Sequence, residues 1–380
     1  TISAWTRFDF PGRAGAYSDF TWDWTCFHGV DWDDHAKRKA IFLFDGKHWD
    51  SAVGRTENAN YDYLMGADVD VNDPLVRTEL CLWGAWYADT TGCDGFRLDA
   101  VKHISAAFYR DWLPAIRAHT GREMFTVGEY WHHHAPALTG YLDAVNNAMS
   151  LFDVPLHQHF HQISRGNGQY DLRQLFEDTL VGCRPAQAVT FVDNHDTQPG
   201  QSLESWVEGW FKASAYTLIL LRSFGYPCVF YGDLAGIPTR NIGPVTELPA
   251  LMRLRRDNAH GEERDFFDDP SLIGFTRAGT AEAPGSGLAA LITDGQGGSK
   301  RMCVGPALGG RVFRCVLGGQ RSAPFQQLPA QLHELRKAAQ GWGTFTTAPG
   351  RPAVYVPRLR PGEWLRRMAA NLSGKRSWAK

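Results

Sequence analysis

The feature that most constrains the fold is an alternation of short apolar segments and helical segments, which begins near residue 67 and ends near residue 263. Three of the apolar segments are followed closely by an acidic residue, namely Asp99, Glu129 and Asp196. Strands that alternate with helices build parallel sheets, because each helix returns the chain to the start of the next strand. The sequence therefore predicts an α/β fold with these carboxyl groups at one end of its strands.

Capping signals and apolar periodicity give the bounds of the expected elements. Asp73 and Pro74 suit a helix start, since Asp accepts hydrogen bonds from the first turn and Pro suits the first position. Ser105 is the expected N-cap of the next helix, which Gly121 ends. Further helices are expected over residues 172–180 and 206–223. Strands are expected over residues 95–98, 124–127, 150–154, 188–192 and 228–231.

Two regions fall outside this alternation. Residues 1–66, rich in Trp, Asp and Gly, predict an irregular β-rich module. Residues 264–357 contain short β-like runs separated by Gly and Pro, which favour a separate β-sandwich. Residues 358–380 form a basic tail. We therefore expect four segments, 1–66, 67–263, 264–357 and 358–380.

Composition argues against several functional classes. The formal net charge of −2 gives no basic excess for binding nucleic acid. No uninterrupted apolar window reaches the roughly 18 residues of a membrane span. The seven cysteines are odd in number and lack Cys-x-x-Cys pairs, which disfavours a disulfide framework or a cysteine zinc site. No signal peptide is visible after Thr1, so we expect a cytoplasmic location. We also expect a monomer.

Three acids at strand ends suit one chemistry in particular. Taken alone, Asp99 could simply cap the following helix, but three such acids are harder to explain as caps. Glycoside hydrolysis needs one carboxyl group to protonate the leaving oxygen and one to meet the cationic sugar, and a third can stabilise the transition state. Glu129 has the most apolar neighbours, including Val127, Tyr130 and Trp131, and is the best candidate for the acid.

Three segments of the sequence resemble those of the α-amylase family. They read Gly-Phe-Arg-Leu-Asp-Ala-Val-Lys-His over 95–103, Val-Gly-Glu-Tyr-Trp over 127–131 and Phe-Val-Asp-Asn-His-Asp over 191–196. The resemblance extends over about residues 3 to 357. It implies a (β/α)8 barrel with an irregular β-rich B domain and a C-terminal β-sandwich. It also implies three catalytic roles, with Asp99 as nucleophile, Glu129 as acid/base and Asp196 as transition-state stabiliser.

The resemblance implies substrate contacts as well. Arg97 would orient Asp99, since the two side chains lie on one strand face. Lys102 and His103 match positions that α-amylases use beyond the cleavage point, which favours an endo-acting amylase over an α-glucosidase. The further residues that would bind the α-glucan are His195 and Trp131.

A calcium requirement follows from the same resemblance. Asp62 and Asp68, with the backbone carbonyl of His103, match the family's main calcium site, and carboxylate oxygens are the ligands that Ca²⁺ takes. The alternative to a metal site is that these acids are simply solvated residues of a loop. Asp50 and Asp70 match a neighbouring metal cluster, in which His28 stands where an acid is expected. The run His132, His133 and His134 could suggest a zinc site, but adjacent side chains splay apart, so we assign it to a loop at the cleft rim.

One motif of the family is absent, because the sequence begins after the third barrel strand. The expected fold is therefore a (β/α)8 barrel that is N-terminally incomplete here. Two hypotheses follow. The first is an endo-acting enzyme that hydrolyses α-1,4 bonds of starch-like or glycogen-like glucans with retention, helped by Ca²⁺. The second is a catalytically impaired fragment or a glucan-binding remnant.

Overall fold

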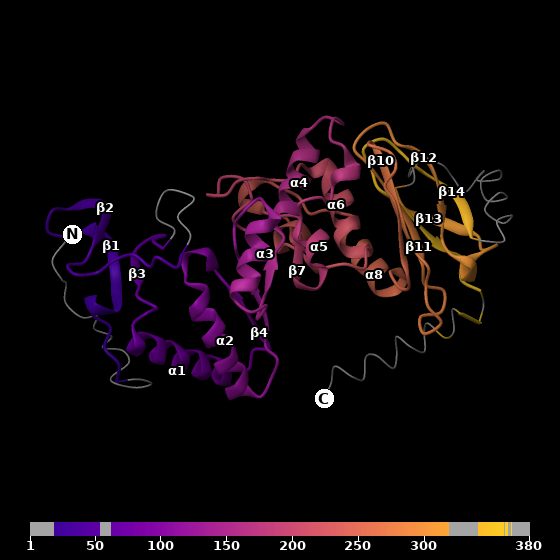
Figure 1. Ribbon diagram of the computed structural model, residues 1–380. Helices are drawn as coiled ribbons and strands as arrows, with labels where there is room; N and C mark the ends of the chain where they lie inside the picture. Colours follow the sequence, from indigo (N-terminus) through magenta and orange to yellow (C-terminus); the bar gives the residue numbers. More distant parts are fainter. Residues whose placement is uncertain (1–18, 54–61, 319–340, 361, 364–365, 367–380) are drawn as a thin grey trace. The chain divides into compact units, whose positions relative to one another are not determined.

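The structure, a computed structural model, describes residues 19–53, 62–318, 341–360, 362–363 and 366 (Figure 1). The segment at 1–18 and most of the basic tail lie outside these residues. The chain divides into two compact units, Thr1–Phe152 and Asp153–Lys380. The boundaries expected at residues 66, 263 and 357 stay predictions.

The first unit begins with a small antiparallel sheet in the order β2-β1-β3. Its strands are β1 (Phe27–Asp33), β2 (Arg38–Leu43) and β3 (Ala67–Val69), preceded by the 3-10 turn η2 (Trp24–Cys26). Cys26, Phe27, Phe44 and Val76 form a buried core beneath it. The sheet thereby rests on the first residues of the following helix.

The rest of the first unit alternates helices with parallel strands. Its elements are α1 (Pro74–Thr91), β4 (Gly95–Leu98), η3 (Val101–His103), α2 (Ala106–Thr120), β5 (Phe125–Gly128), α3 (Ala135–Ala144) and β6 (Ser150–Phe152). Strand β5 pairs in parallel with β4 and with β6. Helices α1 and α2 lie side by side, and Trp112 Nε1 donates to the Leu80 carbonyl at 2.9 Å (Figure 1).

The expected helix start at Asp73 is confirmed, since its Oδ1 accepts from the Leu75 amide at 2.8 Å. Gly121 ends α2 in the left-handed conformation, as expected. The role given to Ser105 is wrong in part, because it occupies the N-cap position but its side chain makes no cap hydrogen bond. Strand β6 is shorter than expected. It ends at Phe152 because the Asp153 carboxylate caps the next helix through the Leu156 amide at 3.1 Å.

The second unit continues with helices around two parallel strands. Its elements up to the C-terminal sheets are α4 (Val154–Arg165), η4 (Leu172–Gln174), α5 (Leu180–Cys183), η5 (Pro185–Gln187), β7 (Ala188–Phe191), α6 (Gly209–Leu221), β8 (Tyr226–Cys228), α7 (Tyr231–Ala235), η6 (Pro238–Arg240) and α8 (Leu248–Asn258). Strands β7 and β8 pair in parallel. From Phe211 to Leu221, every residue of α6 is buried.

Two expectations for this unit are wrong. The helix expected over 172–180 is instead the 3-10 turn η4 followed by irregular backbone, because Asp178 takes a positive φ of 49°. The Asp153 carboxylate accepts from the Leu180 amide at 3.0 Å, which starts α5 at that point. The strand expected over 228–231 is displaced, since β8 ends at Cys228 and α7 begins at Tyr231.

The C-terminal part contains two antiparallel sheets with the orders β13-β15-β11-β10-β9 and β12-β14. Their strands are β9 (Glu263–Phe266), β10 (Leu272–Arg277), β11 (Leu288–Thr293), β12 (Gly298–Cys303), β13 (Phe313–Leu317), β14 (Trp342–Thr347) and β15 (Ala353–Pro357). Leu291, Met302 and Phe345 belong to one buried core between them. The expected β-sandwich is confirmed. Among the described residues, no helix is both long and apolar enough to cross a membrane.

Candidate functional site

Strands β4 and β5 bring two of the predicted acids together in the first unit. Leu98 is in register with Gly128, so Asp99 and Glu129 follow at the same strand ends. The Glu129 amide donates to the Leu98 carbonyl at 2.8 Å, which continues the ladder by one step. A Cβ at Gly128 would lie 2.8 Å from Met149 Sδ, so a larger residue before the acid would require the Met149 side chain to shift. The register of β4 and β5 therefore places the two carboxyl groups at one edge of the sheet.

Arg97 contacts both carboxyl groups. Its Nη1 atom is ion-paired with Asp99, and its Nη2 atom lies 3.3 Å from Glu129 Oε2. The same Glu129 oxygen accepts from the Ala100 amide at 3.1 Å. Ala100 has a positive φ of 46°, which directs its amide back toward the strand ends. Sequence reasoning missed this backbone donor, because nothing in an alanine signals it.

The two acids differ in their surroundings. The Asp99 side chain is 68% exposed, whereas that of Glu129 is 8% exposed. Burial raises the pKa of Glu129, and the nearby charge of Asp99 raises it further, against the lowering effects of Ala100 and Arg97. One carboxyl group is thus accessible, and the other favours its protonated form.

The loops beyond these strands hold further predicted residues. Lys102 Nζ donates to the Trp131 carbonyl at 3.1 Å, which ties η3 to the segment after β5. The Tyr141 hydroxyl donates to the Val101 carbonyl at 3.2 Å. His103 ends η3 and is partly buried. These contacts fix the backbone around Asp99 and Glu129, while the substrate roles of these side chains stay predictions.

Asp196 belongs to the second unit, where it follows β7. The Asn194 side chain accepts from the amides of Asp196 and Thr197, both at 2.9 Å, and so forms a tight turn. His195 is exposed, and its Nε2 atom lies 3.2 Å from Asp196 Oδ2. The Thr197 hydroxyl donates to the buried Asp193 carboxylate at 2.7 Å. The predicted stabiliser therefore lies on a braced turn, and its role beside the other two acids stays a prediction.

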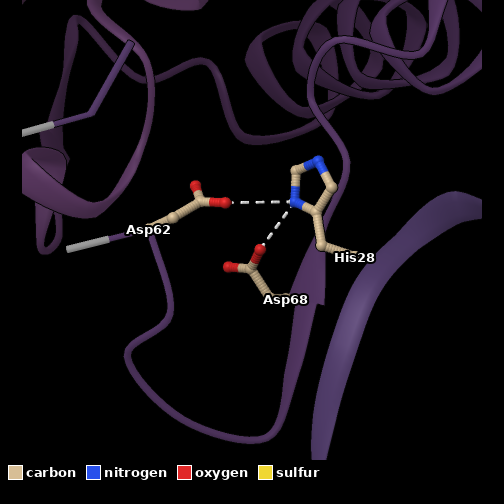
Figure 2. A group of neighbouring side chains, drawn as sticks. All are labelled: His28, Asp62 and Asp68. Carbon is tan, nitrogen blue, oxygen red and sulfur yellow. Dashed lines mark hydrogen bonds and ion pairs between the residues drawn. The ribbon is translucent and has the colours of Figure 1, made fainter. Parts of the chain in front are cut away.

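Three of the predicted metal-binding acids, Asp62, Asp68 and Asp70, contact His28 in the first unit, and Figure 2 shows Asp62 and Asp68 beside its imidazole. His28 Nδ1 lies 2.8 Å from Asp68 Oδ2 and 3.3 Å from Asp62 Oδ2, and Nε2 lies 3.1 Å from Asp70 Oδ1. Burial raises the pKa of Asp62 to about 7, and it also raises that of Asp68. One buried and one partly buried carboxyl group of this kind favour a cation, which would restore their charged form.

Asp50 and Asp70 are held mainly by other partners. Asp50 Oδ2 accepts from the Asn72 side chain at 2.9 Å, and its amide donates to Asp62 Oδ2 at 2.6 Å. Asp70 Oδ2 accepts from Lys47 Nζ at 2.8 Å. The oxygens of Asp62 and Asp68 thus fit the chemistry of Ca²⁺, whereas His28 contributes a nitrogen that Ca²⁺ does not prefer. The ligand roles predicted for Asp50, Asp70 and the His103 carbonyl stay predictions.

Comparison with known proteins gives a consistent result. The family model for the α-amylase catalytic domain matches residues 21–271. An α-amylase of Geobacillus stearothermophilus is 51% identical over 94% of this chain and 63% of its own length. That of Bacillus licheniformis is 48% identical over 94% of this chain and 68% of its own. A cytoplasmic α-amylase of Escherichia coli K12 is 42% identical over 83% of this chain and 66% of its own.

Solved structures of α-amylases have a similar fold. An α-amylase from Anoxybacillus superposes with a TM-score of 0.56 at 18% identity, over 78% of this chain and 65% of that one. An α-amylase from Geobacillus thermoleovorans, solved with acarbose, gives a TM-score of 0.55 at 16% identity, over 78% and 67%. The chain thus spans about two thirds of the length of the relatives it matches.

Proposed function

Because the chain belongs to the α-amylase family, we propose that it hydrolyses internal α-1,4-glucosidic bonds of starch-like glucans with retention. The observation that carries the proposal is that Arg97 contacts two carboxyl groups, of which Asp99 is exposed and Glu129 is buried. A retaining mechanism needs this division, since one group attacks the sugar and the other supplies a proton.

Asp99 is the proposed nucleophile, and it would form a bond to the anomeric carbon as the glycosidic bond breaks. Glu129 is the proposed acid, and its raised pKa keeps the proton that the leaving oxygen takes. It would then accept a proton from the water that releases the sugar. Arg97 orients Asp99 through a charged hydrogen bond. Asp196 is the proposed stabiliser of the cationic transition state, and the proposed glucan contacts are Arg97, Lys102, His103, Trp131 and His195.

We further propose that Ca²⁺ supports the fold through Asp62 and Asp68. The carboxyl groups of Asp62, which is buried, and Asp68, which is partly buried, lie next to one another there, and burial raises the pKa of each. The His103 carbonyl, Asp50 and Asp70 are the further ligands proposed. Bound Ca²⁺ would supply the positive charge that these oxygens require. A monomer in the cytoplasm is also proposed, and the name of the Escherichia coli relative supports that location.

The test of the catalytic proposal is a reducing-sugar assay on soluble starch. Asp99→Asn should lower the rate at least about a thousandfold, since residues that act as one catalytic unit show losses of this size. Glu129→Gln should be equally impaired on starch, but partly rescued on a substrate whose leaving group needs no proton. Proton NMR of the first product should show the α anomer.

Asp94→Asn is the matched control, because Asp94 precedes the same strand at its opposite end and its side chain is 99% exposed. This variant should keep the wild-type rate. An Asp99→Asn protein that keeps more than about a tenth of the activity would refute the assignment. A folded wild-type chain that binds starch without turnover would instead favour the glucan-binding alternative.

A further inference from the structure

His28 reaches the acidic cluster because of an irregularity in its strand. Phe27 is in register with Val69 and Gly29 with Asp68, so His28 has no partner residue of its own in this ladder. Bulges of this kind turn a side chain away from its regular direction. On its other side β1 approaches β2 closely, which needs Gly29, because an added Cβ there would lie 2.2 Å from the Phe42 carbonyl oxygen. The backbone therefore holds the imidazole among the carboxylates.

The two ring nitrogens of His28 have different partners. Nε2 faces Asp70 Oδ1 at 3.1 Å, and Asp70 is held in turn by Lys47 Nζ at 2.8 Å. A histidine that binds a metal through one nitrogen usually donates its other N–H to a carboxylate, which fixes the tautomer and the ring orientation. Asp70 supplies that carboxylate here. The arrangement leaves Nδ1 directed at Asp62 and Asp68, as Figure 2 shows.

Two of the three distances between the ligand atoms are close to those around a tetrahedral ion, and all three atoms lie within 4.8 Å of one another. Zn²⁺ lies about 2.0–2.1 Å from nitrogen and oxygen ligands, so neighbouring ligand atoms are about 3.3 Å apart. His28 Nδ1 is 3.3 Å from Asp62 Oδ2 and 2.8 Å from Asp68 Oδ2, which requires only a small widening. Asp62 Oδ2 also accepts from the Asp50 amide at 2.6 Å, and ligating carboxylates commonly have such support.

The geometry points to a zinc site made by His28, Asp62 and Asp68, with Asp70 as the residue that positions the imidazole. One imidazole nitrogen with two carboxylate oxygens suits Zn²⁺, and a water molecule would complete four ligands. Ca²⁺ prefers six to eight oxygens and gains little from the nitrogen. The site goes beyond the proposed glucan hydrolysis, because binding of the ion needs no catalysis. It would compete with Ca²⁺ for Asp62 and Asp68.

The test measures binding of Zn²⁺ and of Ca²⁺ to the metal-free full chain by titration calorimetry without substrate. Wild type should bind one Zn²⁺ more tightly than Ca²⁺. His28→Asp, which restores an all-oxygen set, should lose at least about 100-fold in Zn²⁺ affinity and gain in Ca²⁺ affinity. Asp70→Asn should weaken Zn²⁺ binding by about 10-fold through the orientation of the ring. His48→Asp is the control, since His48 is exposed and should leave both affinities unchanged.

A spectroscopic arm keeps the test independent of whether each variant folds. Co²⁺ added to metal-free wild type should give the visible absorption of a four-coordinate site with a nitrogen ligand, and Zn²⁺ should abolish it. The proposal is overturned if Zn²⁺ binds no more tightly than Ca²⁺, or equally well to wild type and His28→Asp. Binding of neither ion would also overturn it, because His28 would then itself be the counter-ion. None of these outcomes depends on starch hydrolysis, so the catalytic proposal stands or fails separately.

Discussion

In the second unit the carboxylates of Asp193 and Asp233 meet the ammonium group of Lys212, whereas in the first unit several carboxylates surround the imidazole of His28. Lys212 is 2% exposed, and its Nζ atom lies 2.8 Å from Asp193 Oδ2 and is ion-paired with Asp233. The Tyr216 hydroxyl donates to Asp233 Oδ2 at 2.7 Å. Both groups place buried negative charge beside a positive one.

The difference lies in where the positive charge comes from. Lysine carries its charge on the chain, so the Lys212 group is complete whenever the second unit is folded. Histidine is charged only when it is protonated, and its nitrogen can bind a metal instead. The His28 group can therefore exchange its counter-charge with the solvent, and the Lys212 group cannot. The stability of the first group should respond to ions in solution, while that of the second should not.

The largest expected effect is that of Lys212→Met. The change leaves Asp193 and Asp233 buried without their cation, which costs about 3–5 kcal/mol of stability. Urea unfolding should show the loss, and turnover on starch should fall as well, because Asp193 braces the turn that carries Asp196. Lys39→Met, at an exposed position of β2, should change stability by less than about 0.5 kcal/mol. A Lys212→Met loss below about 1 kcal/mol would contradict the fixed counter-ion.

A smaller effect is expected when a chelator removes divalent cations. An ion that binds only the folded state at a concentration one hundred times its Kd stabilises that state by about 2.7 kcal/mol. Thermal unfolding should therefore begin several degrees lower with chelator and recover when the ion is returned. Lys212→Met should keep this response, since its cluster holds no exchangeable charge. A melting curve that chelation does not move would show that the His28 group acts without an ion.

The smallest effect is a pH dependence in the metal-free protein. Burial raises the pKa of Asp62 from 3.8 to about 7, so the folded chain keeps a proton that the unfolded chain releases between these values. Burial alone would lower the pKa of His28, but Asp68, Asp70 and Asp62 raise it above 6.5. Both groups contribute stability at low pH that is lost as pH rises, through 4 to 7 for Asp62 and through the folded pKa for His28.

The measurement is the free energy of unfolding against pH in the presence of chelator. Each group can change it by at most about 1.4 kcal/mol per pH unit. Asp62→Asn should flatten the decline, whereas Asp94→Asn should leave it unchanged, because Asp94 lies on the surface. An Asp62→Asn protein whose stability falls as steeply as that of the wild type between pH 4 and 7 would contradict the direction assigned to Asp62.

The sequence by itself predicted the elements that depend on local signals. Asp73 caps α1, because an N-cap depends only on hydrogen bonds within the first turn of its helix. Gly95–Leu98 forms β4, as its short apolar segment predicted. The neighbouring ends of β4 and β5 followed from strand order, so Asp99 and Glu129 could be placed together without a structure. The matching family is confirmed, while the roles of these acids remain proposals.

Only the tertiary structure decided contacts between segments far apart in the chain. Asp153 stops β6 and starts α5 by binding amides about 27 residues away, which no helical periodicity over 172–180 could reveal. A lone lysine in the apolar helix α6 was a signal that sequence reasoning passed over, since its two partners lie on other elements. The bulge at His28 likewise depends on pairing between β1 and β3. Local patterns fix backbone conformation, but the charge that a buried side chain meets is set by the packing of distant segments.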